Sequence, residues 1–98
     1  MSLTVTEEAA KWYIDEMGLE SGQYVHFFVK LYGGIPTAHS NYFLGVSVGK
    51  DGEIGISDEV EGVTFYFTQQ DKWFLEAYHL TVDMGEEEAV FEFTPVND

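Results

Sequence analysis

The sequence predicts a single α+β domain over residues 1–98, with mixed or antiparallel β-sheets in a sandwich-like arrangement. Apolar residues first recur with a helical period near the N-terminus, and from residue 24 the period changes to two. A second, shorter helical signal separates later strand signals, which is typical of an α+β domain. With 98 residues, 45% of them hydrophobic, the chain is long enough for one domain and too apolar to be disordered.

The N-terminal helix is expected from Thr6 to Met17. The Thr6 side chain can cap the helix, and the two acids that follow suit the positive field of its first turn. The apolar stripe of this helix, at i, i+3, i+4 and i+7, consists of Ala10, Tyr13, Ile14 and Met17. Gly18 is the expected end of the helix.

The central part of the chain predicts strands. Residues 24–32 alternate with aromatic side chains on both faces, which predicts a central strand covered on both sides. We expect a loop over residues 33–41 and a strand over residues 42–48. A turn at residues 50–52 then predicts that residues 53–56 pair back on that strand as a hairpin.

The next segment combines acidic residues with a second helical signal. Residues 58–61 carry three acids and predict a solvated acidic corner before a strand over residues 63–67. Thr68 with Asp71 three positions later resembles a capping box, which predicts a short second helix reaching Tyr78.

The C-terminal part predicts a hairpin. Leu80, Val82 and Met84 alternate with polar residues, and apolar residues alternate again around Glu92. We therefore expect two final strands joined by a turn around Gly85.

Composition excludes several functions. The chain has 18 acids, four lysines and no arginine, giving a net charge of −14. This charge excludes binding to a nucleic-acid backbone and disfavours an anionic membrane surface. With no cysteine there can be no disulfide, thiolate metal site or cysteine nucleophile. No signal peptide or membrane-length apolar run is recognisable, so a cytoplasmic protein is expected.

Several blocks of the chain, taken in order, carry a family resemblance. They are residues 3–10, 28–34, 62–67, 80–83 and 91–97. With these blocks the chain resembles the HesB-like family, whose best-known members are A-type iron–sulfur assembly proteins such as IscA. It looks most similar to a cysteine-free, YneR-like subgroup from Gram-positive bacteria. The resemblance implies a HesB-like domain and a relation to iron–sulfur cluster biosynthesis.

The chain departs from the family at its metal ligands. Family members that hold iron or a cluster use three cysteines, one of them in the loop after the strand that here ends at Tyr32. In this chain that loop carries residues 35–39 without cysteine. Because clusters need soft thiolate ligands, no iron–sulfur cluster is expected. The resemblance therefore implies a binding or regulatory module of unknown partner, which is not an enzyme.

The same loop contains the candidate binding residues, which are Gly33, Gly34, Thr37, His39, Ser40 and Asn41. The alternative function is a metal-binding protein in which His39, with nearby carboxylates, holds iron or zinc. The competing interpretation of His39 is an exposed loop histidine, because an isolated histidine specifies no metal geometry, and the two glycines suit a turn with positive φ. His26 and His79 are expected to be hydrogen-bonded histidines on strands, and sequence leaves open whether the three histidines converge.

The expected partner is a protein. The charge of −14 favours a partner with a basic surface. Aromatic residues on both faces of several strands also leave a homodimer open, because an exposed apolar patch usually marks an interface.

Overall fold

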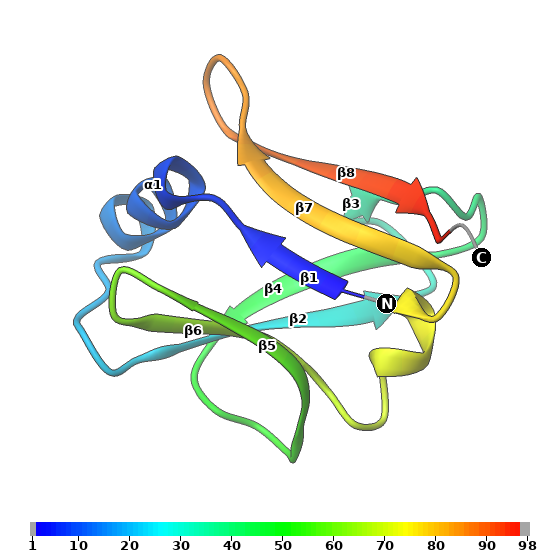
Figure 1. Ribbon diagram of the computed structural model, residues 1–98, viewed down its shortest axis with the longest axis horizontal. Helices are drawn as coiled ribbons and strands as arrows, with labels where there is room; N and C mark the ends of the chain where they lie inside the picture. Colours follow the sequence, from blue (N-terminus) through cyan, green and yellow to red (C-terminus); the bar gives the residue numbers. More distant parts are fainter. Residues whose placement is uncertain (1, 97–98) are drawn as a thin grey trace.

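The structure is a computed structural model and describes residues 2–96. The elements in chain order are β1 (Ser2–Val5), α1 (Glu7–Met17), β2 (Tyr24–Lys30), β3 (Ile35–Pro36), β4 (Phe43–Val48), β5 (Ile54–Val60), β6 (Val63–Thr68), the 3₁₀ turn η1 (Lys72–Leu75), β7 (Tyr78–Met84) and β8 (Ala89–Pro95). Two sheets form, with strand orders β1-β7-β8 and β3-β4-β2-β6-β5 (Figure 1). The pairs β1–β7 and β2–β6 are parallel and the other pairs are antiparallel, which confirms an α+β fold with mixed sheets. None of the helices within these residues is long and apolar enough to cross a membrane.

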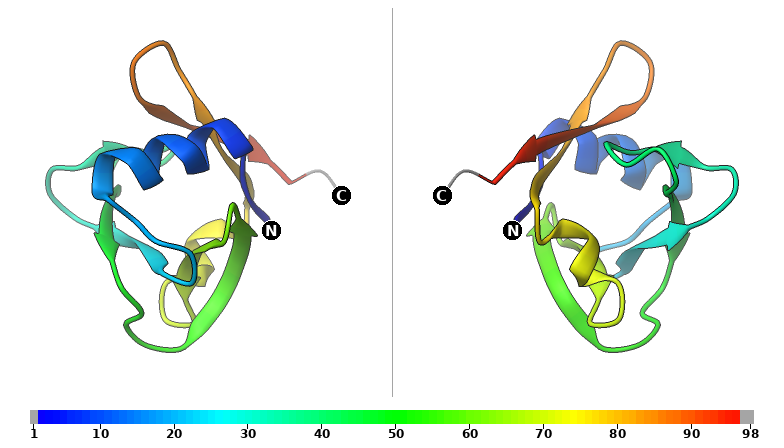
Figure 2. Two further views of the ribbon diagram at one scale, coloured as in Figure 1. Left: turned by 90° about the vertical axis from the view of Figure 1, so that its left-hand side faces the viewer. Right: turned by 90° about the vertical axis from the view of Figure 1, so that its right-hand side faces the viewer.

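Helix α1 forms as the sequence predicts. The Thr6 hydroxyl oxygen accepts a hydrogen bond from the Ala9 N–H at 3.2 Å, and Gly18 ends the helix with φ of 63°. Ala9, Ala10 and Tyr13 are buried, so the predicted stripe faces the protein interior. The helix lies across one end of the two sheets (Figure 2).

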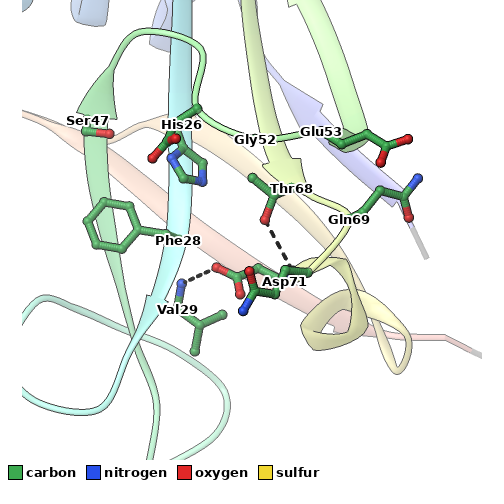
Figure 3. Close-up of a pocket in the computed structure, with 11 residues that line it drawn as sticks. His26, Phe28, Val29, Ser47, Gly52, Glu53, Thr68, Gln69 and Asp71 are labelled. Carbon is green, nitrogen blue, oxygen red and sulfur yellow. Dashed lines mark hydrogen bonds between the residues drawn. The ribbon is translucent and has the colours of Figure 1, made fainter.

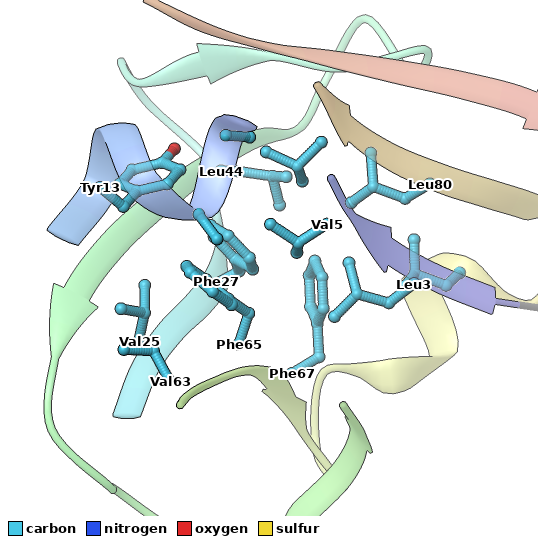
Figure 4. Close-up of a cluster of buried hydrophobic side chains, with 14 of the residues drawn as sticks. Leu3, Val5, Tyr13, Val25, Phe27, Leu44, Val63, Phe65, Phe67 and Leu80 are labelled. Carbon is cyan, nitrogen blue, oxygen red and sulfur yellow. The ribbon is translucent and has the colours of Figure 1, made fainter. Parts of the chain in front are cut away.

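The core lies between the two sheets and α1 (Figure 4). The five-stranded sheet contributes Phe27, Phe65 and Phe67, which are fully buried, and their rings pack with centroids about 6 Å apart. From the other side Leu80 of β7 and Tyr13 of α1 cover these rings. The predicted central position is confirmed, because β2 has β4 and β6 as neighbours. The predicted cover on both sides is wrong, because Tyr24 and Phe28 on the outer face are only half-buried.

Two predictions about the middle of the chain are wrong. Strand β5 pairs with β6 and not with β4, so residues 53–56 do not close a hairpin on the preceding strand. The segment that joins β4 to β5 crosses to the far edge of the sheet, where β5 forms a hairpin with β6. Glu61 and Gly62, with φ of 55° and 79°, make the two-residue turn of that hairpin. The expected loop over residues 33–41 also contains the two-residue strand β3, which pairs with β4.

The second helix and the acidic corner also differ from expectation. The helix is one 3₁₀ turn, and Tyr78 already belongs to β7. Thr68 accepts a hydrogen bond from the Asp71 N–H at 3.3 Å, but the Asp71 carboxylate bonds elsewhere and does not complete a capping box. Asp58 lies within β5, half-buried, and accepts a hydrogen bond from the Val5 N–H. The C-terminal hairpin of β7 and β8 is confirmed.

Candidate functional site

The loop after β2 is organised by a single threonine. The Thr37 hydroxyl lies 2.9 Å from the carbonyl oxygens of both His39 and Tyr42, and its oxygen accepts a hydrogen bond from the His39 N–H. Gly33 and Gly34 have φ of 56° and 137°. A Cβ at Gly34 would lie 2.6 Å from the Leu44 carbonyl oxygen, so the turn needs glycine there.

His39 is exposed at the surface of this loop. Its Nδ1 accepts a hydrogen bond from the Asn41 N–H at 3.2 Å, and its ring lies 4.6 Å from that of Tyr42. Ser40 is exposed beside it. Thr37, His39 and Asn41 thus form a locally bonded loop, whose role in binding stays a prediction.

The three histidines lie on different elements. His26 is on β2, His39 is in the loop, and His79 on β7 shares a hydrogen bond with the Ser2 hydroxyl at 2.7 Å. Over residues 2–96, no three His, Asp or Glu side chains form a group that could hold a metal ion. The iron or zinc site at His39 therefore stays a prediction.

Exposed apolar side chains flank this loop at its two ends. Leu31 and Tyr32 extend beyond β2 with 62% and 85% of their surface exposed, and Trp73 of η1 is 44% exposed. The Tyr42 ring contacts the Trp73 ring edge-on at 5.6 Å and so joins the loop to η1. We call Leu31, Tyr32 and Trp73 the apolar contact surface. Whether it joins two copies of the chain, as in the homodimer left open above, stays a prediction.

A pocket of about 710 Å³ lies on the outer face of the five-stranded sheet. The hydrogen-bonded register between β2 and β6 ends at His26 and Tyr66, after which the two strands separate. The pocket occupies this wedge, with walls from β2, β4, residues 51–53 and residues 68–71 (Figure 3). We call it the outer-face pocket.

The side chain of His26 forms part of this pocket's inner wall. It points away from the core, since Val25 and Phe27 on either side of it face inward. Its ring stacks on that of Tyr66 at 5.0 Å with 13° between the planes, and it lies 5.5 Å from that of Phe28. The two neighbouring rings fix the orientation of the imidazole.

Hydrogen bonds hold two other parts of the pocket wall. The Tyr66 hydroxyl oxygen accepts a hydrogen bond from the Asp51 N–H at 2.6 Å, and the hydroxyl lies 3.2 Å from the Asp51 carbonyl oxygen. On the opposite side the Asp71 carboxylate accepts a hydrogen bond from the Val29 N–H at 3.2 Å (Figure 3). That carboxylate takes the place of a strand partner for β2 after β6 has diverged.

Comparison with known proteins places the chain among its relatives. Over 95 residues it is 38% identical to the pyruvate dehydrogenase inhibitor of Bacillus subtilis strain 168, a match covering 95% of this chain and 99% of that protein. The chain belongs to the family of that inhibitor. It is also 27% identical over 88 residues to an uncharacterized protein of Staphylococcus saprophyticus, covering 88% of this chain and 90% of that protein. No family model matches the chain.

The outer-face pocket was not predicted from the sequence. The sequence predicts that His26 is a hydrogen-bonded strand histidine, but among residues 2–96 its buried Nε2 has no hydrogen-bond partner. The alternation of β2 places His26 on the face opposite Phe27, and this was readable from the sequence. The acids that line the same pocket come from residues 51–53 and 71, and only the folded structure brings those segments together with β2.

Proposed function

We propose that this protein is a non-catalytic regulatory protein that binds pyruvate dehydrogenase and inhibits it. The observation that supports the proposal is the relationship, over nearly the whole chain, to a protein named for that inhibition. The chain also lacks a cysteine nucleophile, and its histidines lie on separate elements. Inhibition by occupying a surface of the enzyme requires no catalytic group.

The apolar contact surface is the part of the molecule best suited to this role. Aromatic residues dominate the binding energy of protein interfaces, and Tyr32 and Trp73 expose large rings to solvent. Tyr32 projects from a loop tip, where it can enter a cavity of a partner without rearrangement of the sheets. The charge of −14 favours a partner surface with basic groups around that cavity.

We further propose that the fold is HesB-like and that the protein is a cysteine-free branch of the iron–sulfur cluster biosynthesis family. A cysteine-free chain has none of the thiolates that hold a cluster. The loop in which cluster-binding HesB-like proteins carry a ligand cysteine directly follows Leu31 and Tyr32 in this chain. On this proposal a former metal-binding loop supports a protein-binding surface.

The test is inhibition of the pyruvate dehydrogenase complex of the organism that encodes the chain. The purified protein is added in increasing amounts, and pyruvate-dependent NADH formation is followed. We expect saturable inhibition, with direct binding to the complex at the same concentrations. Full activity of the complex in saturating protein, together with no detectable binding, would overturn the proposal.

Two variants locate the surface responsible. Tyr32→Ser removes an exposed aromatic ring, and its expected effect is a loss of affinity by about tenfold or more. Val90→Ser removes another exposed apolar side chain, on β8 outside the apolar contact surface, and should leave inhibition unchanged. Equal loss in both variants would mean that the inhibitory surface is not the one described.

A further inference from the structure

The outer-face pocket contains a polar atom that the fold itself does not satisfy. His26 is only 9% exposed, and its Nε2 is buried without a hydrogen-bond partner among the described residues. Buried polar atoms in native proteins nearly always have a partner, because leaving one unpaired costs free energy. The imidazole is held in place by its stacking on Tyr66, so a ligand would find Nε2 already oriented.

The charge of the pocket restricts what that ligand can be. Asp51, Glu53 and Asp71 line the pocket, and no lysine does. Lys50 and Lys72 are their sequence neighbours but contribute nothing to the walls. An anion would therefore face three carboxylates with no cation among the lining residues, whereas a cation would be attracted by the carboxylates.

The remaining wall adds hydrogen-bonding groups and one aromatic ring. Ser47, Thr68 and Gln69 present hydroxyl and amide groups, and Phe28 contributes an aromatic ring, whose face attracts cations (Figure 3). A neutral imidazole nitrogen accepts one N–H hydrogen bond, and carboxylates accept several. The volume of about 710 Å³ is typical of pockets for small molecules.

We propose that the outer-face pocket binds an organic cation that carries N–H donors, an ammonium or a guanidinium group. One N–H donates to His26 Nε2, and the carboxylates that line the pocket attract the positive charge. The cation is either a free small molecule or a lysine or arginine side chain of a bound protein. The pocket is lined by other residues than those of the apolar contact surface, and the proposal stands or falls independently of pyruvate dehydrogenase inhibition.

The test is a titration of the isotope-labelled full chain followed by NMR. The free probes are agmatine and cadaverine, and the tethered probes are short blocked peptides with one arginine or one lysine. Glutarate serves as the anionic counterpart. Saturable shifts are expected at the amides of Val29 and residues 68–71, together with a change in the nitrogen shift of His26 Nε2. Binding by the free probes indicates a small-molecule ligand, and binding by the peptides alone indicates a partner side chain.

Charge-matched variants separate a built site from general attraction to an acidic protein. Glu53→Gln with Asp71→Asn should weaken cation binding about tenfold or more, since charged hydrogen bonds are lost while the new amide oxygen at position 71 can still accept from the Val29 N–H. Asp15→Asn with Glu16→Gln removes the same charge from the exposed face of α1 and should change affinity less than twofold. His26→Phe keeps a ring on Tyr66 but removes Nε2, and it should weaken binding about fivefold.

Three results would overturn the proposal. They are the absence of saturable shifts with every cation, shifts of equal size with glutarate, and equal weakening in the α1 control. Should the double variant fail to fold, Glu53→Gln alone decides the matter, because Glu53 is exposed and its side chain makes no described hydrogen bond.

Discussion

The carboxylate of Asp58 accepts a hydrogen bond from the backbone N–H of Val5 at 2.8 Å, joining the two sheets. Strand β1 pairs with β7 along one edge, and its other edge faces β5 without a backbone ladder. The N–H of Val5 would lack an acceptor on that side if the carboxylate were absent. A side chain thus replaces a strand partner where β1 and β5 meet.

Asp58→Ala is therefore expected to lower the free energy of unfolding by about 1–3 kcal/mol, the cost of leaving a partly buried N–H unpaired. Urea unfolding followed by fluorescence measures the difference. Glu59→Ala is the matched control, because Glu59 is exposed on the same strand, and it should change stability by no more than about 0.5 kcal/mol. Equal stability of the two variants would show that the Val5–Asp58 hydrogen bond contributes nothing.

The same residue shows why sequence predicts some elements and not others. Helix α1 and the β7–β8 hairpin were predictable, because a cap, a stripe or an alternation lies within each segment. Asp58 was assigned to a solvated corner because its own segment is acidic, whereas its role depends on Val5, 53 residues away. The parallel β2–β6 pairing is equally non-local, so the local pattern does not contain it. The β5–β6 pairing is local, because residues 61 and 62 alone separate the two strands, and sequence reasoning missed it by pairing residues 53–56 backward with the preceding strand.

The candidate site likewise has features that the sequence predicts and features that it does not. The positive φ of Gly33 and Gly34 was predictable, because a glycine pair after a strand indicates a turn. The pairing of Asp71 with Val29 was not, since the residue type and spacing suggested a helix cap. The acidic residues of the outer-face pocket therefore come together only in the folded structure, where β2 and β6 diverge.

Gly45 is expected to be intolerant of a side chain. It lies opposite Phe28 in the β2–β4 ladder, and a Cβ there would overlap the Phe28 ring, which covers the glycine. Gly45→Ala should displace that ring from the wall of the outer-face pocket and lower stability by about 1–3 kcal/mol. Thermal and urea unfolding measure the loss, and aromatic NMR signals report the ring.

The control for Gly45→Ala is Ser47→Ala, two residues along the same face of β4. Ser47 is exposed, so this substitution should stay within about 0.5 kcal/mol of the wild type. Retention of wild-type stability by Gly45→Ala would mean that the Phe28 ring moves aside freely.

Stability should fall at alkaline pH because of Tyr13. Burial, with a smaller contribution from Glu88, raises the pKa of its phenol from 10.0 to about 12. Below pH 10 both the folded and unfolded states keep the proton, and the contribution of Tyr13 is fully present. Between about pH 10 and 12 only the unfolded state ionises, so the free energy of unfolding falls by about 2–3 kcal/mol in all.

Tyr13→Phe should remove this part of the alkaline decrease, because phenylalanine has no proton to lose. Urea unfolding at about pH 8 and about pH 11 measures the decrease in each variant. Tyr32→Phe is the control, since Tyr32 is 85% exposed and its substitution should leave the decrease as in the wild type. A decrease of the same size in Tyr13→Phe would assign it to other groups.

The Tyr66 hydroxyl is expected to hold the loop that closes one side of the outer-face pocket. It accepts a hydrogen bond from the Asp51 N–H at 2.6 Å and lies 3.2–3.3 Å from the carbonyl oxygens of Asp51 and Gly49. Tyr66→Phe keeps the ring that stacks on His26 but removes these contacts. It should lower stability by about 1–2 kcal/mol and speed hydrogen exchange at the Asp51 amide.

Tyr24→Phe is the matched control, because Tyr24 packs edge-on against Tyr66 and no described hydrogen bond uses its hydroxyl. Hydrogen exchange followed by NMR should show unchanged protection at Asp51 in this variant. If Tyr66→Phe left that protection intact as well, the loop would be held by its own turn, in which Gly52 has φ of 80°. Faster exchange in Tyr66→Phe alone would assign the closed pocket wall to one hydroxyl group.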